Sequence, residues 1–154
     1  MDRDGDLDLF VANYLAFDLA TAAEPGQGVH CHWKGVPVNC GPKGLPTDTN
    51  LLYRNNGNGT FTDVSVASGI AAVTGRYSMT ALAADLDHDG WIDLYVATDS
   101  TAAILYRNNR DGTFTDVTEK AGLTRAGWAS AVAVGALDND DVDDLFITGY
   151  GYEA

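Results

Sequence analysis

An acidic motif occurs three times in this chain of 154 residues, and each copy runs directly into an aliphatic segment. The copies occupy residues 1–8, 85–93 and 136–144, and the middle one reads Asp-Leu-Asp-His-Asp-Gly-Trp-Ile-Asp. Carboxylates on alternate residues around a glycine turn, with another one four residues later, supply the hard oxygen ligands that Ca²⁺ prefers. The motif therefore predicts calcium-binding loops, here termed the first, middle and third loops.

The middle loop carries the complete set of expected ligands. These are four carboxylates and one backbone carbonyl, those of Asp85, Asp87, Asp89, Asp93 and Trp91. An EF-hand opens with the same spacing, but it needs a Glu at position twelve, where this chain has Val96, and it needs flanking helices. Residues 77–84 and 94–97 are instead short apolar runs typical of strands. We expect the middle loop to join two strands.

The outer loops retain fewer of these ligands. In the third loop Ala136 stands at the first carboxylate position and Asp141 at the glycine position, and the leading position of the first loop falls before Met1. The remaining expected ligands are carboxylates, those of Asp2, Asp4, Asp8, Asp138, Asp140 and Asp144. The alternative is a solvated acidic turn. Only three of the 22 acidic residues are Glu, and this consistent choice of the shorter carboxylate favours metal binding.

A second repeated motif indicates the architecture. Residues 52–65 (LYRNNGNGTFTDVS) return as residues 105–118 (LYRNNRDGTFTDVT), and the Asn-Gly and Asp-Gly pairs inside them predict hairpin turns. Leu94 and Leu145, which follow successive acidic loops, are 51 residues apart. A period near that length with four short strands is typical of a β-propeller blade. The predicted fold is all-β, with about three propeller-type blades of four-stranded antiparallel sheet and Asp-rich calcium loops.

The two interleaved motifs resemble the FG-GAP/VCBS repeats of integrin α-chain-type propellers, and the LYRNN motif resembles the bacterial ASPIC/UnbV-associated members. The resemblance covers nearly the whole chain, as one repeat array over residues 1–154. It implies calcium bound between two strands of a blade, with ligands at the five middle-loop positions named above. It also implies an extracellular or periplasmic module for binding or adhesion. The sequence departs from the family pattern at Ala136, at Asp141 and at the missing head of the first loop.

The first repeat is interrupted by an insertion over residues 16–49. This insertion holds all four prolines, both cysteines and two of the three histidines. Cys31 and Cys40 close a ten-residue loop with few hydrophobic residues. We expect a disulfide between them, contributing about 2 to 4 kcal/mol. The alternative is a zinc or copper site that adds His30 and His32, although these flank Cys31 too closely for the usual spacing of structural zinc ligands.

Charge and hydropathy restrict the partners and the location. The formal net charge is −13, which disfavours nucleic acid and anionic membrane surfaces as partners. No apolar run approaches the roughly eighteen residues of a membrane span, so membrane insertion is not expected. We expect an extracellular or periplasmic protein whose signal peptide lies outside this sequence.

Three classes of function follow. The first is a binding or adhesion module for a protein or glycan ligand. The second is a self-assembling homo-oligomer or filament, since about three blades suggest either a segment of a longer chain or a fold completed by neighbouring copies. Exposed faces carrying Phe10, Tyr95 and Phe146 would favour such stacking. The third is an enzyme, but three copies of one motif do not single out an acid–base pair, and no nucleophile elbow, phosphate loop or HExxH motif is present.

Overall fold

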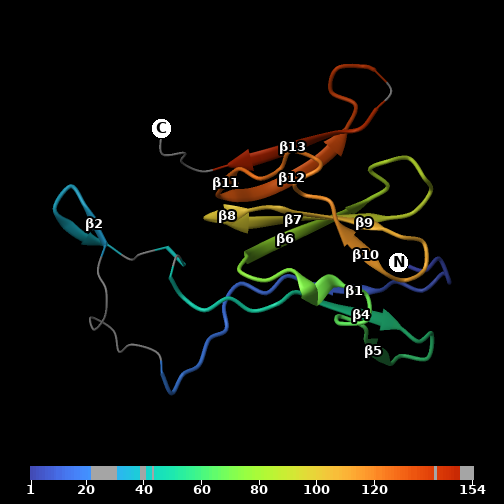
Figure 1. Cartoon of the computed structure of the whole chain (residues 1–154), viewed down its shortest axis with the longest axis horizontal. Helices are drawn as coiled ribbons and strands as arrows, with labels where there is room; N and C mark the ends of the chain where they lie inside the picture. Colours follow the sequence, from blue (N-terminus) through green and yellow to red (C-terminus); the bar gives the residue numbers. More distant parts are fainter. Residues whose placement is uncertain (22–30, 39–40, 43, 141, 150–154) are drawn as a thin grey trace.

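The middle repeat forms a complete blade in the computed structural model, which describes residues 1–21, 31–38, 41–42, 44–140 and 142–149 (Figure 1). Its four strands are hydrogen-bonded in the order β10-β9-β7-β6, and every neighbouring pair is antiparallel. The strands are β6 (Tyr77–Ala84), β7 (Asp93–Asp99), β9 (Ile104–Asn108) and β10 (Phe114–Asp116). This blade confirms the predicted all-β propeller-type fold and the hairpin within the second LYRNN motif.

The first and third repeats form partial sheets of the same pattern. In the first, the strands are β1 (Leu9–Val11), β4 (Leu51–Asn55) and β5 (Phe61–Asp63), in the order β1-β4-β5. In the third, the strands are β12 (Ala129–Gly135) and β13 (Asp144–Gly149). By sequence, β1 and β13 are the counterparts of β7, and β12 is the counterpart of β6. Within the described residues, β1 therefore has no neighbour equivalent to β6.

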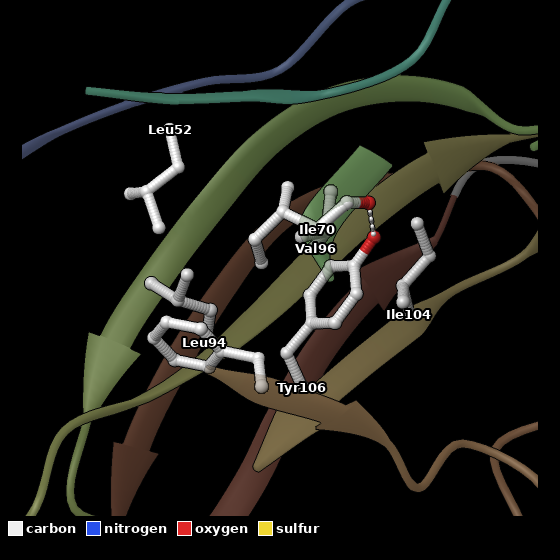
Figure 2. Packing of buried hydrophobic residues seen from close by; sticks show 7 residues of the cluster. Leu52, Ile70, Leu94, Val96, Ile104 and Tyr106 are labelled. Atoms are coloured by element: carbon white, nitrogen blue, oxygen red, sulfur yellow. Dashed lines mark hydrogen bonds between the residues drawn. The ribbon is translucent and has the colours of Figure 1, made fainter. Parts of the chain in front are cut away.

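Alternate residues of β7 build the core on both faces of the middle blade. One face lies in a buried cluster that also holds residues of the first repeat (Figure 2), namely Leu52, Ile70, Leu94, Val96, Ile104, Tyr106 and Phe114. The other face carries Tyr95 and Ala97, which pack with Val132, Leu145 and Ile147 of the third repeat. This two-sided cover explains why six consecutive residues of β7, from Asp93 to Thr98, are buried.

The aromatic residues at the matching positions of β1, β7 and β13 do not share one environment. Tyr95 is only 1 % exposed, so the expectation that it lies on an exposed blade face is wrong. The reason is that β12 and β13 cover this face of β7. Phe146 is 57 % exposed and Phe10 is partly buried against the first core cluster.

Short elements complete the described structure. They are the hairpin of β2 (Cys31–Trp33) and β3 (Val36–Val38), the pair of β8 (Thr101–Ala102) and β11 (Ala126–Gly127), and the 3-10 turn η1 (Ile70–Ala72). The β2 and β3 hairpin belongs to the insertion and stands apart from the blades (Figure 1). No helix in the described part of the chain is long and apolar enough to cross a membrane.

The base of the insertion is fixed to the blades by hydrogen bonds. The backbone N–H of Ala16 donates to the carbonyl of Pro46 at 3.0 Å, which closes the insertion at its root. The hydroxyl of Tyr77 donates to the carbonyl of Leu45 at 3.0 Å and accepts the N–H of Gly44 at 3.1 Å, which ties the returning arm to β6. His30 and Cys40 lie outside the described residues, so the disulfide and the alternative zinc or copper site stay predictions.

Candidate metal centre in the middle loop

The middle loop joins β6 to β7 and gathers three carboxylates. One oxygen from each of Asp85, Asp87 and Asp89 lies within 4.8 Å of the others. The backbone turns sharply because His88 and Gly90 both have left-handed conformations, with φ of 54° and 87°. Glycine adopts this conformation without a steric cost, whereas a residue with a Cβ does so at some expense. The turn directs alternate side chains toward one point.

All three loops contain the same unusual backbone turn. Arg3, His88 and Asn139 occupy matching positions and have φ of 64°, 54° and 62°. Positive φ is uncommon outside glycine, so three matches at one position indicate a shared loop conformation. Gly5 of the first loop, with φ of 96°, likewise matches Gly90.

Backbone amides within the middle loop hold the carboxylates in place. Asp85 accepts the N–H of Asp89 at 3.0 Å on Oδ1 and the N–H of Gly90 at 2.8 Å on Oδ2. Asp89 accepts the N–H of Trp91 at 2.8 Å on Oδ1. An ionised carboxylate has about four lone-pair sites, so these oxygens retain the capacity to bind a cation.

Two arginines of the β9–β10 hairpin pair with the same carboxylates. The Nε of Arg107 donates to Oδ2 of Asp87 at 2.8 Å. Arg110 donates to Oδ2 of Asp89 through Nε at 3.0 Å and Nη2 at 2.8 Å. This hydrogen bond is the main cause that lowers the pKa of Asp89, and it raises the pKa of Arg110. The crowded negative charge therefore attracts cationic groups from a neighbouring strand pair.

Asp93 is not one of the three converging carboxylates. It is 3 % exposed, and both its oxygens accept backbone N–H groups, from Asn108 at 2.8 Å and from Leu86 at 3.2 Å. The side-chain amide of Asn108 donates in turn to the carbonyl of Ile92 at 3.1 Å. Burial raises the pKa of Asp93. In this arrangement Asp93 anchors the base of the loop to β9, and its role as a direct ligand stays a prediction.

The same anchor recurs in the first repeat. Oδ1 of Asp8 accepts the N–H of Asn55 at 2.9 Å, and the side-chain amide of Asn55 donates to the carbonyl of Leu7 at 3.1 Å. In the third loop, Asp144 accepts the N–H of Leu137 at 2.8 Å, as Asp93 accepts that of Leu86. Sequence reasoning missed the two asparagines, although their recurrence in both LYRNN motifs was an available signal.

The other predicted ligands of the outer loops make local turn contacts. Asp2 accepts the N–H of Asp4 at 3.3 Å, and Asp138 accepts the N–H of Asp140 at 3.2 Å. The N-terminal amino group of Met1 contacts the carboxylate of Asp8. Within the described residues, the only group of three such ligands that converges is the one in the middle loop.

Side chains at the left-handed position connect successive loops. The guanidinium of Arg3, in the first loop, lies 5.1 Å from the centre of the Trp91 ring in the middle loop. Nε2 of His88, in the middle loop, lies 3.6 Å from Oδ2 of Asp143 in the third loop. The first contact is a cation–π interaction, and the second is an ion pair when His88 is protonated. Neighbouring loops are therefore in direct contact.

The blades and their acidic loops define a repeat protein of the β-propeller type. A family model described as an FG-GAP-like repeat matches residues 40–96 and 85–147. Because the two matches cover more than half of the chain, the protein belongs to the FG-GAP-like repeat family, whose repeat is a non-enzymatic module. No curated protein matches the chain.

The donor set of the middle loop fits a hard divalent cation. Its converging groups are carboxylates, with no nitrogen or sulfur donor among them. Oxygen-only sites suit Ca²⁺ or Mg²⁺, whereas zinc and copper sites usually include imidazole or thiolate ligands. The Asp85, Asp87 and Asp89 cluster is therefore able to hold a metal ion of this class.

Proposed function

We propose that the protein is an extracellular or periplasmic calcium-binding module of the ASPIC/UnbV-associated type, with a binding or adhesion role toward a protein or glycan. The observation that carries this proposal is the convergence of Asp85, Asp87 and Asp89 in a loop between two strands of a complete blade. The FG-GAP-like repeat supports it, because such repeats often bind calcium.

Calcium would be held by the three converging carboxylates, by the carbonyl of Trp91 and by Asp93. The ion supplies positive charge that offsets the repulsion between the crowded aspartates. An ion that binds only the folded protein stabilises it by about 2.7 kcal/mol at a hundredfold excess over Kd. Extracellular modules bind calcium with Kd values of about 10⁻⁴ to 10⁻³ M, which suits a loop of few protein ligands.

The outer loops are proposed as secondary calcium sites. Their ligands would be the carboxylates that remain at the matching positions, those of Asp2, Asp4, Asp8, Asp138, Asp140 and Asp144. The shared left-handed turn at Arg3, His88 and Asn139 supports this assignment. Because each outer loop has three carboxylates at the matching ligand positions and the middle loop has four, we expect each outer loop to bind calcium more weakly.

The test is calcium binding by titration calorimetry, with the unfolding midpoint measured in millimolar calcium and in excess chelator. For Asp87→Ala we expect most of the calcium-dependent rise in the midpoint to disappear. Glu119→Ala, an exposed acidic residue outside the loops, should keep the full rise. If the unfolding midpoint of the unaltered protein were the same in calcium and in chelator, the loops would be solvated turns.

A second candidate function is self-assembly into a homo-oligomer or filament. The exposed side chain of Phe146 on β13 favours it, because a large apolar residue on a sheet face is a common contact between subunits. Light scattering over a range of protein concentrations tests this role. Self-assembly would be supported if the particle size of the unaltered protein increases with concentration and that of Phe146→Lys does not.

Export also supports the proposed disulfide between Cys31 and Cys40, because disulfides persist in oxidising compartments. Alkylation without reductant, followed by mass spectrometry, tests this link. Two alkylated cysteines in freshly secreted protein would rule the disulfide out.

A further inference from the structure

The tip of the hairpin between β4 and β5 contains two Asn-Gly pairs, Asn56-Gly57 and Asn58-Gly59 (Figure 1). All four residues are exposed to solvent. An asparagine followed by glycine is chemically labile, because the next backbone nitrogen can attack the side-chain amide carbon and glycine has no Cβ to obstruct that attack. The hydrogen bonds of the hairpin differ between the two pairs.

The side-chain carbonyl of Asn58 is polarised by two donors from one residue. Its Oδ1 accepts the backbone N–H of Thr60 at 3.1 Å and the hydroxyl of Thr60 at 2.6 Å. Two donors on one carbonyl oxygen stabilise the negative charge that develops there when a nucleophile attacks the carbon, as in an oxyanion hole. The backbone N–H of Gly59, which adjoins this side chain, has no acceptor among the residues that the structure describes, and the space beside its α-carbon is open.

The hydrogen bonds of the other pair oppose the same reaction. The backbone N–H of Gly57 donates to Oδ1 of Asn55 at 3.0 Å, so this nitrogen must give up a hydrogen bond before it can attack. The side-chain amide of Asn56 is held at both ends, since Nδ2 donates to the Thr60 hydroxyl at 2.9 Å and Oδ1 accepts the Thr62 hydroxyl at 3.0 Å. The folded hairpin therefore protects Asn56 and leaves Asn58 open to attack.

The matching hairpin of the middle repeat already contains the residue that this reaction would produce. Asp111 is the counterpart of Asn58, and its Oδ1 accepts the backbone N–H of Thr113 at 3.0 Å and the hydroxyl of Thr113 at 2.6 Å. Asn109 likewise repeats the side-chain bonds of Asn56. An aspartate at position 58 therefore fits the turn without rearrangement.

We propose that Asn58 is a site of spontaneous deamidation in the folded protein, that it reacts before Asn56, and that the turn retains the aspartate product. The backbone nitrogen of Gly59 forms a bond to Cγ of Asn58, the bond from Cγ to Nδ2 breaks, and the proton of the attacking nitrogen leaves with Nδ2 as ammonia. One water molecule then opens the succinimide ring. Opening at Cγ gives aspartate, whose ionised carboxylate adds one negative charge to the hairpin, and opening at the backbone carbonyl gives isoaspartate.

The experiment incubates the whole chain in mildly alkaline buffer and follows both asparagines by peptide mapping, with fragment ions in the mass spectrometer assigning each site. In the folded protein we expect Asn58 to convert roughly two- to tenfold faster than Asn56, the rate equivalent of one hydrogen bond. The same chain in concentrated urea is the control, because both pairs are then Asn-Gly in an unfolded chain and should react at similar rates. A ratio in the folded protein equal to that in urea, or no conversion of Asn58, would overturn the proposal.

Two variants at Thr60 separate the effect of the hydrogen bonds from that of the Asn-Gly motif. Thr60→Val removes the hydroxyl that bonds both asparagine side chains, so the rate at Asn58 should fall and the difference between the two sites should narrow. Thr60→Ser keeps a hydroxyl and should retain the difference. An unchanged ratio in Thr60→Val would overturn the proposed control by the hairpin.

The variant Asn58→Asp tests whether the turn retains the product. Because Asp111 makes the same contacts in the middle repeat, this variant should fold with an unfolding midpoint no lower than that of the unaltered protein. A lower midpoint would overturn the claim that the hairpin accommodates aspartate at this position.

Discussion

The carboxylate of Asp93 and the amide groups of Asn108 form a two-bond link between the base of the middle loop and the neighbouring strand β9. Asp93 accepts the backbone N–H of Asn108 at 2.8 Å, and the side chain of Asn108 donates to the carbonyl of Ile92 at 3.1 Å. Because Asp93 is buried, this link fixes the base of the loop without a metal ion. A bound ion would add a second restraint through Asp85, Asp87 and Asp89, which converge within the loop.

Replacing Asp93 by alanine should destabilise the protein even in excess chelator. The change leaves the N–H groups of Asn108 and Leu86 without their acceptor, and an unsatisfied buried group costs about 1 to 3 kcal/mol. Urea denaturation in chelator measures this loss, and Asp138→Ala, an exposed residue of the third loop, is the control. A loss that occurs only in calcium would instead show that Asp93 acts as a ligand.

Replacing Arg110 by glutamine should strengthen calcium binding by the middle loop. The change removes a positive charge that pairs with Asp89 at 2.8 Å and would repel an incoming cation. Two unit charges about 4 Å apart in water interact by about 1 kcal/mol, and the double charge of Ca²⁺ raises this to about 2 kcal/mol, so an affinity gain of up to about thirtyfold is expected. Titration calorimetry measures the gain, with Lys120→Gln, an exposed cation outside the hairpin, as the control. Weaker binding in Arg110→Gln would mean that the arginine helps to position the ligands. The first repeat already has Gly57 at the matching position, so the hairpin does not require an arginine there.

Replacing Asp111 by asparagine should remove one source of acid sensitivity. The hydroxyl of Thr113 donates to Asp111 at 2.6 Å, and this bond is the first cause that lowers the pKa of Asp111. A lowered folded-state pKa contributes stability above the unfolded pKa of about 3.9, and this contribution is lost as pH falls through the folded-state value. Asn58, the counterpart in the first repeat, makes the same turn bonds to Thr60 without a charge.

The measurement is urea denaturation of the unaltered protein and of Asp111→Asn, from about pH 6 down to below the unfolded pKa of about 3.9. The unaltered protein should be the more stable of the two at the upper end, and the difference should shrink as pH falls. A difference that stays constant with pH would contradict the assignment.

Replacing Tyr106 by phenylalanine should destabilise the core between the first and middle repeats. The hydroxyl of Tyr106 donates to the carbonyl of Ile70 at 2.9 Å, and both residues are fully buried (Figure 2). A hydrogen bond of this kind contributes about 0.5 to 1.5 kcal/mol. Chemical denaturation measures the loss. Tyr53→Phe, at the matching and more exposed position of the first repeat, should change stability less.

Much of the fold was predictable because it depends on local patterns that recur. The spacing of the LYRNN motifs and of Leu94 and Leu145 gives the repeat, and the Asn-Gly and Asp-Gly pairs give the hairpins. The convergence of alternate carboxylates in the middle loop also follows from a local turn. These features require no knowledge of how the repeats pack together.

The features that were missed depend on contacts between segments far apart in the sequence. Tyr95 is buried because the third repeat covers its face, which the pattern of β7 alone does not reveal. Arg107 and Arg110 reach the middle loop from a hairpin about twenty residues later, and Asn108 secures Asp93 in the same way. From the sequence pattern, these residues were predicted only to form part of a hairpin.

The contacts made at the left-handed position give the row of loops a direction. Each anchor between an aspartate and an asparagine joins residues of one repeat, whereas Arg3 and His88 each reach forward to the loop of the following repeat. If a repeat were duplicated at another place in such an array, it would keep the link between its own aspartate and asparagine. The side chain at its left-handed position would instead meet the loop of a different following repeat. Duplication can preserve the shape of a loop in this way, while divergence at a single position changes how that loop is connected to the next.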